Sequence, residues 1–208
     1  MNDNIVTSQN YYMFNGVKIG FFFDEEEDGY ILSEAKGQLD ELFVPNTVNG
    51  KPVKDINGDI FYTLTGFNKV SISEENLNFT TVDGVLFTKG MKKLVIYPPE
   101  RKDEVYLVPK GVEEIGEDSF CNRFLKTLVL QTGVKYIIQY SINCRNLETL
   151  YIPKTLEKVY FKAFAGCDLI KTVYYQGVEE EWNNIDFTDF NKSVTKAEIR
   201  FNHDYSSK

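Results

Sequence analysis

The sequence predicts a β-rich solenoid of about five stacked coils with capped ends, and two patterns carry this prediction. The first is a repeat with a period of 22 residues, in which apolar side chains recur in register. The clearest columns are Val112, Val134, Leu156 and Val178; Ile115, Ile137 and Val159; and Phe120, Ile142 and Phe164. Stacked coils need such columns, because each coil must offer the next coil the same contact.

The second pattern is a short alternating run at the start of each repeat. The clearest runs lie at residues 125–130, 147–152 and 170–175. Alternation points Leu128 and Leu130 toward the interior of the coil and Val129 outward. A proline or glycine soon ends the strand, because proline cannot donate a hydrogen bond to a sheet. Each coil is therefore expected to contain a strand, a turn, a second short extended segment and a compact corner.

The first half of the chain contains a weaker version of this pattern. Residues 39–44 are expected to form the strand of an early coil, and residues 53–61 its second segment and corner. Residues 68–72 begin another coil. It becomes a variant repeat at about residues 76–101, where two β-rich runs flank the polar segment at 88–93 and predict a hairpin.

Both ends of the chain differ from the repeat, as the caps of a solenoid must. Residues 17–23 and 29–32 predict a hairpin that covers the first open edge. Residues 178–185 predict a short helix whose Trp182 covers the last core layer, and residues 197–201 a closing strand that protects the edge. The expected division is an N-terminal β cap at 1–38, a solenoid at 39–175, and a C-terminal cap with a polar tail at 176–208.

Composition and charge argue against some classes of function. Hydrophobic residues make up 42% of the sequence, which is enough for a continuous core. The net charge is -8 and the basic residues are scattered, which argues against a nucleic-acid partner. No apolar stretch predicts membrane insertion. Residues 1–4 lack the pattern of a signal peptide, so the expected location is cytoplasmic as written, or the cell surface or the secreted state if a leader was removed.

Several motifs resemble one repeat family. Residues 152–159 (Ile-Pro-Lys-Thr-Leu-Glu-Lys-Val), followed by residues 163–167 (Ala-Phe-Ala-Gly-Cys), resemble the leucine-rich repeats of the BspA-like (Treponema pallidum-type) class. Residues 76–119 are similar to the long variant repeat of that family, and residues 174–182 to its usual C-terminal ending. The likeness covers residues 39–201.

The resemblance implies a right-handed leucine-rich-repeat solenoid of the α/β class. It also implies a bacterial protein, often on the cell surface and associated with adhesion or protein binding, and it brings no catalytic residues. The chain departs from the family pattern at two corners, where Cys121 directly follows Phe120 and Cys144 stands two residues after Ile142. We expect these corners to be distorted.

The best candidate for a binding site is the outward column of the main strands. Its members are Phe43, Leu107, Val129, Tyr151 and Tyr174. Stacking brings neighbouring members within about 5 Å of each other, which predicts an exposed apolar and aromatic stripe of the kind that binds partners. The alternative interpretation is that such side chains simply suit strands. The neighbouring Thr127, Thr149 and Thr172 are expected to form a structural ladder.

Three features could be taken for metal sites, and a structural role suits each better. Residues 24–29 have the opening spacing of an EF-hand loop, but the twelfth position is Ala35, so a solvated hairpin turn is expected. The run at 179–181 suits a helix N-terminus. Cys121, Cys144 and Cys167 are 23 residues apart, which places one thiol on each coil and predicts buried or half-buried free thiols. No metal and no cofactor are expected.

The sequence therefore predicts a noncatalytic module that binds a protein partner through the sheet face of the solenoid, as a monomer. The only histidine, His203, lies in the polar tail, and no catalytic residue is assigned. Two alternatives remain open. One is a spacer or stalk without a ligand, and the other is a carbohydrate-binding or hydrolytic protein, which requires a deep pocket with paired carboxylates.

Overall fold

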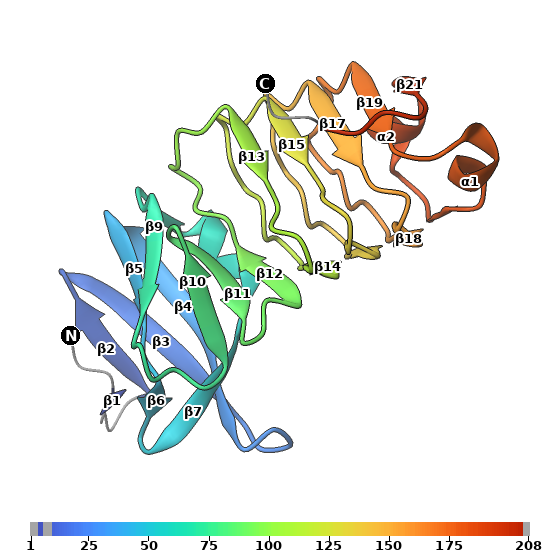
Figure 1. Ribbon diagram of the computed structural model, residues 1–208. Coiled ribbons are helices and arrows are strands. Elements are labelled where there is room, and N and C mark those ends of the chain that lie inside the picture. Colours follow the sequence, from blue (N-terminus) through green and yellow to red (C-terminus); the bar gives the residue numbers. More distant parts are fainter. Residues whose placement is uncertain (1–3, 6–9, 206–208) are drawn as a thin grey trace. The chain divides into compact units, whose positions relative to one another are not determined.

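The computed structural model describes residues 4–5 and 10–205 (Figure 1). The first residues of the expected N-terminal cap and the last three of the expected polar tail lie outside this range. The chain forms two compact units. The first contains residues 1–90 and 95–101, and the second contains residues 91–94 and 102–208. The domain boundaries drawn from the sequence remain a prediction.

The first unit is built almost wholly of β-strands. They are β1 (Asn4–Ile5), β2 (Tyr11–Phe14), β3 (Val17–Asp24), β4 (Gly29–Gln38), β5 (Glu41–Val44), β6 (Thr47–Val48), β7 (Lys51–Ile56), β8 (Leu64–Thr65), β9 (Lys69–Ile72), β10 (Phe79–Val82) and β11 (Val85–Thr88), with a 3-10 helix η1 (Gly58–Tyr62). Strands β3 and β4 are antiparallel, as the expected hairpin requires. Strands β5 and β9 are parallel, which is the pairing expected between two successive coils. Fully buried Ile19, Leu32 and Leu42 anchor the core.

Strands β11 and β12 (Lys93–Ile96) are neighbours in one sheet on either side of residues 89–92, as the hairpin expected around 88–93 requires. The structure adds a second hairpin before it, which was not expected. Strands β10 and β11 pair antiparallel from Phe79↔Thr88 to Val82↔Val85, so the turn falls at Asp83 and Gly84. Both turn residues have a positive φ, of 50° and 74°. An Asp-Gly pair suits such a two-residue turn, since its twist matches that of the flanking strands. The continuous run expected at 81–87 is therefore wrong.

The second unit consists of two parallel sheets connected coil by coil (Figure 1). Its elements are the first two residues of β12 (Lys93–Ile96), then β13 (Val105–Leu107), β14 (Glu114–Ile115), β15 (Thr127–Val129), β16 (Tyr136–Ile137), β17 (Thr149–Ile152), β18 (Lys158–Val159), β19 (Thr172–Tyr175), α1 (Glu179–Asn183), β20 (Asp186–Phe187), α2 (Lys192–Thr195) and β21 (Glu198–Arg200). One sheet has the order β13-β15-β17-β19-β21, and the other runs through β14, β16, β18 and β20. This arrangement confirms the β-rich solenoid.

The 22-residue period is visible in the strand register. Leu128 pairs with Leu150, and Ile115 with Ile137, each exactly one period later in the sequence. The predicted apolar columns form the core: Val112, Val134, Phe120 and Ile142 are all fully buried. The main chain and the core side chains thus repeat with the same period.

The C-terminal elements are mostly those that the sequence predicts. Helix α1 follows Val178, whose N–H donates to Glu181 Oε2 at 3.0 Å, and Trp182 is buried. Strand β21 closes the longer-strand sheet by parallel pairing with β19. Strand β20 and helix α2 were not expected. No helix within the described residues is long and apolar enough to cross a membrane.

Each corner of the second unit holds a buried polar residue. Asn122 is 1% exposed, and its Oδ1 accepts hydrogen bonds from the N–H groups of Phe124 and Leu125 at 2.8 and 2.9 Å. Cys144, 22 residues later, donates from Sγ to the carbonyl oxygen of Phe120 at 3.8 Å. The corners at 120–122 and 142–144 are thus equivalent to each other, with Asn122 at the position that Cys144 holds one coil later. The distortion expected relative to the family pattern stays a prediction.

We predict that Asn122→Ala lowers the free energy of unfolding by about 2–4 kcal/mol, since two buried N–H groups lose their acceptor. Urea denaturation followed by circular dichroism measures this loss. The matched control is Asn183→Ala on the exposed surface of helix α1, which should change stability by less than about 0.5 kcal/mol. Equal effects of the two substitutions would contradict the role of Asn122 as a corner acceptor.

The three cysteines are free thiols with different surroundings. Cys144 and Cys167 are buried, whereas Cys121 is half-buried, as the sequence predicts. Burial raises the pKa of the Cys167 thiol to about 12, and it raises the pKa of Cys144 well above its usual value. Cys167 Sγ lies 3.2 Å from the carbonyl oxygen of Ile142, to which the protonated thiol can donate. The folded state therefore favours the neutral thiols.

The raised pKa of Cys167 predicts a loss of stability at alkaline pH. An unfolded cysteine ionises near pH 8.5, while the folded thiol keeps its proton to about pH 12. The folded state holds more protons in this window, so the free energy of unfolding falls with pH, by at most about 1.4 kcal/mol per pH unit for this group. In Cys167→Ala this contribution is absent.

Urea denaturation at pH 8 and pH 10 tests this effect. The stability advantage of the wild type over Cys167→Ala should shrink between the two pH values. Cys121→Ala is the control and should show a smaller change, because the Cys121 thiol is only half-buried. A constant difference between the wild type and Cys167→Ala would contradict the prediction.

Candidate functional site

The candidate column lies across the longer-strand sheet of the second unit. Leu107 pairs with Val129, Val129 with Tyr151, and Tyr151 with Tyr174, each on the next strand. The parallel register therefore aligns four of the five candidate residues on adjacent coils. Thr127, Thr149 and Thr172 form a second aligned row, two positions earlier on β15, β17 and β19.

The two tyrosines form the centre of the column. Their rings stack with centroids 4.6 Å apart and planes 14° from parallel. Both side chains are half-buried, so each keeps one surface for further contacts. Partial burial raises the pKa of the Tyr151 hydroxyl above its ordinary value, which keeps this hydroxyl a neutral donor at physiological pH.

Arg200 extends the column by one strand. It pairs with Tyr174 in the register of β19 and β21. Its guanidinium carbon lies 5.5 Å from the centre of the Tyr174 ring, and its Nη1 donates to the Tyr174 hydroxyl at 3.2 Å. Glu198 accepts from Arg200 Nε at 3.0 Å and orients the guanidinium. Sequence reasoning missed Arg200, although it lies three residues into the strand expected at 197–201.

Two members of the predicted column are not exposed. Val129 is only 2% exposed, and it lines the same cavity as Tyr205. Phe43 is 4% exposed and belongs to β5, in the first unit. Strand β2 covers it: the ring of Phe14 lies 6.3 Å from that of Phe43, and the Tyr12 hydroxyl donates to the Phe43 carbonyl oxygen at 2.8 Å. The expected exposure of both residues is wrong.

A cavity of about 470 Å³ opens beside the column. It lies where strands β15, β17 and β19 end, under the C-terminal segment. Its lining combines apolar column residues with side-chain amides, hydroxyls and charged groups from Leu107, Lys110, Val129, Gln131, Thr132, Tyr151, Pro153, Gln176, His203, Asp204 and Tyr205, among others. The mixture of aromatic faces and polar groups suits recognition of a polar chain that carries apolar side chains.

The described lining of this cavity has few groups that could act as acids or bases. Asp204 is the single carboxylate among the described residues that line it, whereas glycoside hydrolysis needs two. His203 lies against an aromatic ring, with its centroid 5.1 Å from that of Tyr174. Burial raises the pKa of Tyr12 and of the Cys144 and Cys167 thiols, and these groups do not line the cavity.

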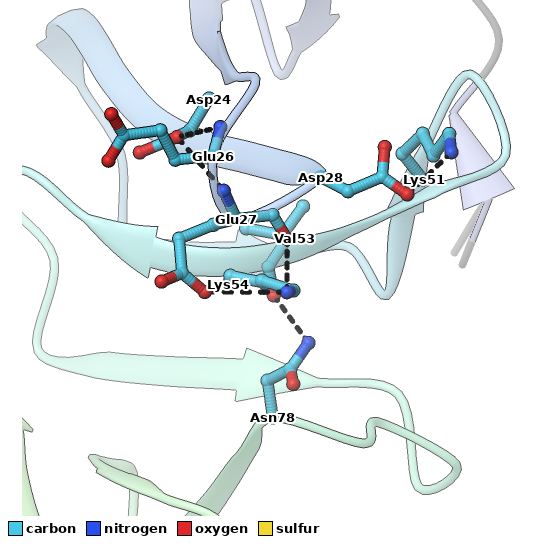
Figure 2. Close-up of polar contacts among 8 residues, drawn as sticks. All are labelled: Asp24, Glu26, Glu27, Asp28, Lys51, Val53, Lys54 and Asn78. Atoms are coloured by element: carbon cyan, nitrogen blue, oxygen red, sulfur yellow. Dashed lines mark hydrogen bonds and ion pairs between the residues drawn. The ribbon is translucent and has the colours of Figure 1, made fainter.

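The acidic loop at 24–29 is a hairpin turn between β3 and β4 (Figure 2). Asp24 Oδ1 accepts from the N–H groups of Glu26 and Glu27 at 3.0 and 3.1 Å, so it shapes the turn. Lysines from strand β7 pair with the other carboxylates: Lys51 Nζ lies 2.7 Å from Asp28 Oδ2, and Lys54 Nζ lies 3.5 Å from Glu27 Oε2. The predicted hairpin turn is confirmed. Within residues 4–5 and 10–205, no group of three metal-ligating side chains comes together.

Asn78 links the variant hairpin to the same region of the first unit (Figure 2). Its Nδ2 donates to the carbonyl oxygen of Val53 on β7 at 2.9 Å. Val53 is fully buried, so this bond satisfies a carbonyl that water cannot reach. The hydrogen bonds and ion pairs of this region thus have structural roles in the first unit.

Comparison with known proteins agrees with this architecture. A family model described as "BspA type Leucine rich repeat region (6 copies)" matches residues 104–202. Six copies in this region exceed the five coils that we expected for the whole chain. No curated protein matches the chain.

Three solved structures of bacterial proteins are similar to parts of this chain. A leucine-rich repeat protein from Eubacterium ventriosum aligns with a TM-score of 0.52 at 18% identity, over 65% of this chain and 42% of that protein. The pneumococcal vaccine antigen PcpA aligns with a TM-score of 0.44 at 18% identity, over 81% of this chain and 58% of the antigen. A leucine-rich cell surface protein from Faecalibacterium prausnitzii aligns with a TM-score of 0.36 at 19% identity, over 71% and 51%.

This chain therefore spans about half the length of the solved proteins that it resembles. The first of these alignments supports the fold alone, because its sequence identity is low. The apolar columns, the paired parallel sheets and the family match agree with one another. Residues 104–202 of this chain are similar to a BspA-type leucine-rich repeat region.

Proposed function

We propose that the chain is a noncatalytic interaction module that binds a protein partner through the longer-strand sheet of its second unit. The observation that carries this proposal is the register of Leu107, Val129, Tyr151 and Tyr174, which places a stacked tyrosine pair beside a cavity. Tyrosine and arginine are enriched among residues that dominate binding energy at protein interfaces. Arg200 supplies the arginine next to Tyr174.

The shape of this surface favours a protein partner over a small substrate. Successive coils repeat the same position, so the surface is extended along the sheet and suits a long ligand. Charged pairs flank it on the outside: Lys126 contacts Glu104 at 2.7 Å, and Lys171 contacts Glu148 at 2.8 Å. These exposed pairs add little stability, but they give the rim of the surface a polar character like that of other interfaces.

The noncatalytic part of the proposal rests on the side chains that line the cavity. A single carboxylate and a ring-packed histidine offer no acid–base pair. The resemblance to BspA-like proteins suggests adhesion at a bacterial surface as one setting for such binding.

The double substitution Tyr151→Ser with Tyr174→Ser tests the proposed surface. It removes both rings while leaving a small polar side chain on each strand. We expect the variant to bind a partner at least about tenfold more weakly than the wild type, because each buried interface aromatic contributes on the order of 1–2 kcal/mol. The measurement is capture by the immobilised protein from surface-protein extracts, followed by titration with each purified protein that the wild type retains.

Tyr136→Ser is the matched control, because it removes a half-buried tyrosine from the shorter-strand sheet, on β16. This variant should retain every partner that the wild type captures. Circular dichroism must show that all variants remain folded. If the double variant keeps the same partners at the same affinity, the chain acts as a spacer and the proposal fails.

A further inference from the structure

The chain covers part of its own candidate surface. After β21 it turns back at Asn202, whose φ is 57°, and runs across the neighbouring strand. The N–H of Asn202 donates to the carbonyl oxygen of Gly177 at 2.9 Å, and the N–H of His203 donates to that of Tyr175 at 3.0 Å. These two bonds hold the start of the segment 203–205, which we name the return segment.

Two aromatic side chains of the return segment contact the two stacked tyrosines. The His203 ring lies edge-on to Tyr174, with centroids 5.1 Å apart and planes at 71°. The Tyr205 ring lies edge-on to Tyr151, also at 5.1 Å, with planes at 80°. Edge-to-face contacts of this kind are favourable and directional. The return segment therefore places each ring over one member of the column.

The spacing of these contacts matches the geometry of the sheet. Residues two apart in an extended chain are separated by about 6–7 Å, and adjacent strands by about 4.8 Å. A chain that crosses the strands obliquely can thus place every second side chain on successive coils. His203 and Tyr205 do this over β19 and β17, running toward β15. The cavity continues in that direction, to Val129 and Leu107.

The return segment is held weakly enough to be displaced. Asn202, His203 and Asp204 are exposed, and Tyr205 is half-buried. The side chain of Asp204 forms no ion pair within the described residues. A competing chain could therefore replace the two aromatic contacts without disturbing the coils beneath them.

We propose that the return segment occupies the binding site of the partner. The partner is an extended protein segment with aromatic side chains at positions i and i+2. This inference rests on the proposed function and specifies the ligand of the same surface. The partner segment displaces His203 and Tyr205, stacks its own rings on Tyr174 and Tyr151, and extends into the cavity beside Val129.

The test uses a variant of the full chain in which the return segment no longer places rings on Tyr174 and Tyr151. We name it the opened variant. The variant His203→Ala with Tyr205→Ala removes both internal rings and keeps the backbone hydrogen bonds of Asn202 and His203. The probe is a fluorescein-labelled peptide with the sequence of residues 201–208, Phe-Asn-His-Asp-Tyr-Ser-Ser-Lys, and fluorescence anisotropy measures its binding. We expect the opened variant to bind the probe about tenfold more tightly than the wild type, in which the tethered segment competes at an effective concentration near millimolar.

Three controls identify the contacts. A probe with serine in place of histidine and tyrosine should not bind the opened variant. Adding Tyr151→Ser to the opened variant should abolish binding of the original probe. Tyr140→Ala, which alters an exposed aromatic residue outside the longer-strand sheet, should leave the affinity of the wild type unchanged.

The inference is overturned if the folded opened variant does not bind the probe, or if it binds the probe and the serine probe equally. It is also overturned if the wild type and the opened variant have the same affinity. The assay contains no partner protein, so its failure leaves the effect of Tyr151→Ser with Tyr174→Ser on partner capture intact. Conversely, probe binding without any loss of capture would refute the proposed function alone.

Discussion

The whole second unit depends on one constraint, the parallel main-chain register between successive coils. Coils of equal length bring equivalent strand residues into register, and a longer coil must place its additional residues outside the strands. Leu128, Leu150 and Val173 are in register along the longer strands, and Ile115, Ile137 and Val159 along the shorter ones. Side-chain packing follows from this register, because equivalent residues lie directly above each other.

The same constraint explains why polar groups are found inside the corners. A corner must turn the chain while its main-chain groups are buried, and each buried group needs a partner. Asn122 supplies an acceptor for two N–H groups, and Cys144 and Cys167 donate to carbonyl oxygens of the preceding coil. Asn and Cys can both occupy a corner because each is small and can form hydrogen bonds with main-chain groups, within its own coil for Asn122 and with the preceding coil for Cys144 and Cys167. The fold therefore constrains size and polarity at the corner more tightly than residue type.

The sequence predicts the architecture well because the residues that repeat every 22 positions are those that face the core. A column such as Phe120, Ile142 and Phe164 can be recognised from the repeat alone, without knowing how the ends of the chain fold. The candidate surface was predicted less well, because exposure depends on segments far away in sequence. Phe43 is covered by strand β2, and Val129 is buried beside a cavity that the C-terminal segment also lines. Neither contact follows a period. Arg200 was missed for the opposite reason, since it continues the column with a charged residue in place of an apolar one.

Strand β21 has a consequence for how the sheet ends. A stack of equivalent coils offers its last main-chain edge to any further strand, and nothing in the repeat itself limits the number of coils. Here the final strand is only three residues long, and its Glu198 and Arg200 bind each other across the outer face. Any strand that added beyond β21 would have to match a charged pair instead of the apolar residues that precede it. The last strand of the sheet thus differs from the preceding strands in the chemistry of its outer face, while its parallel pairing with β19 is the same as theirs.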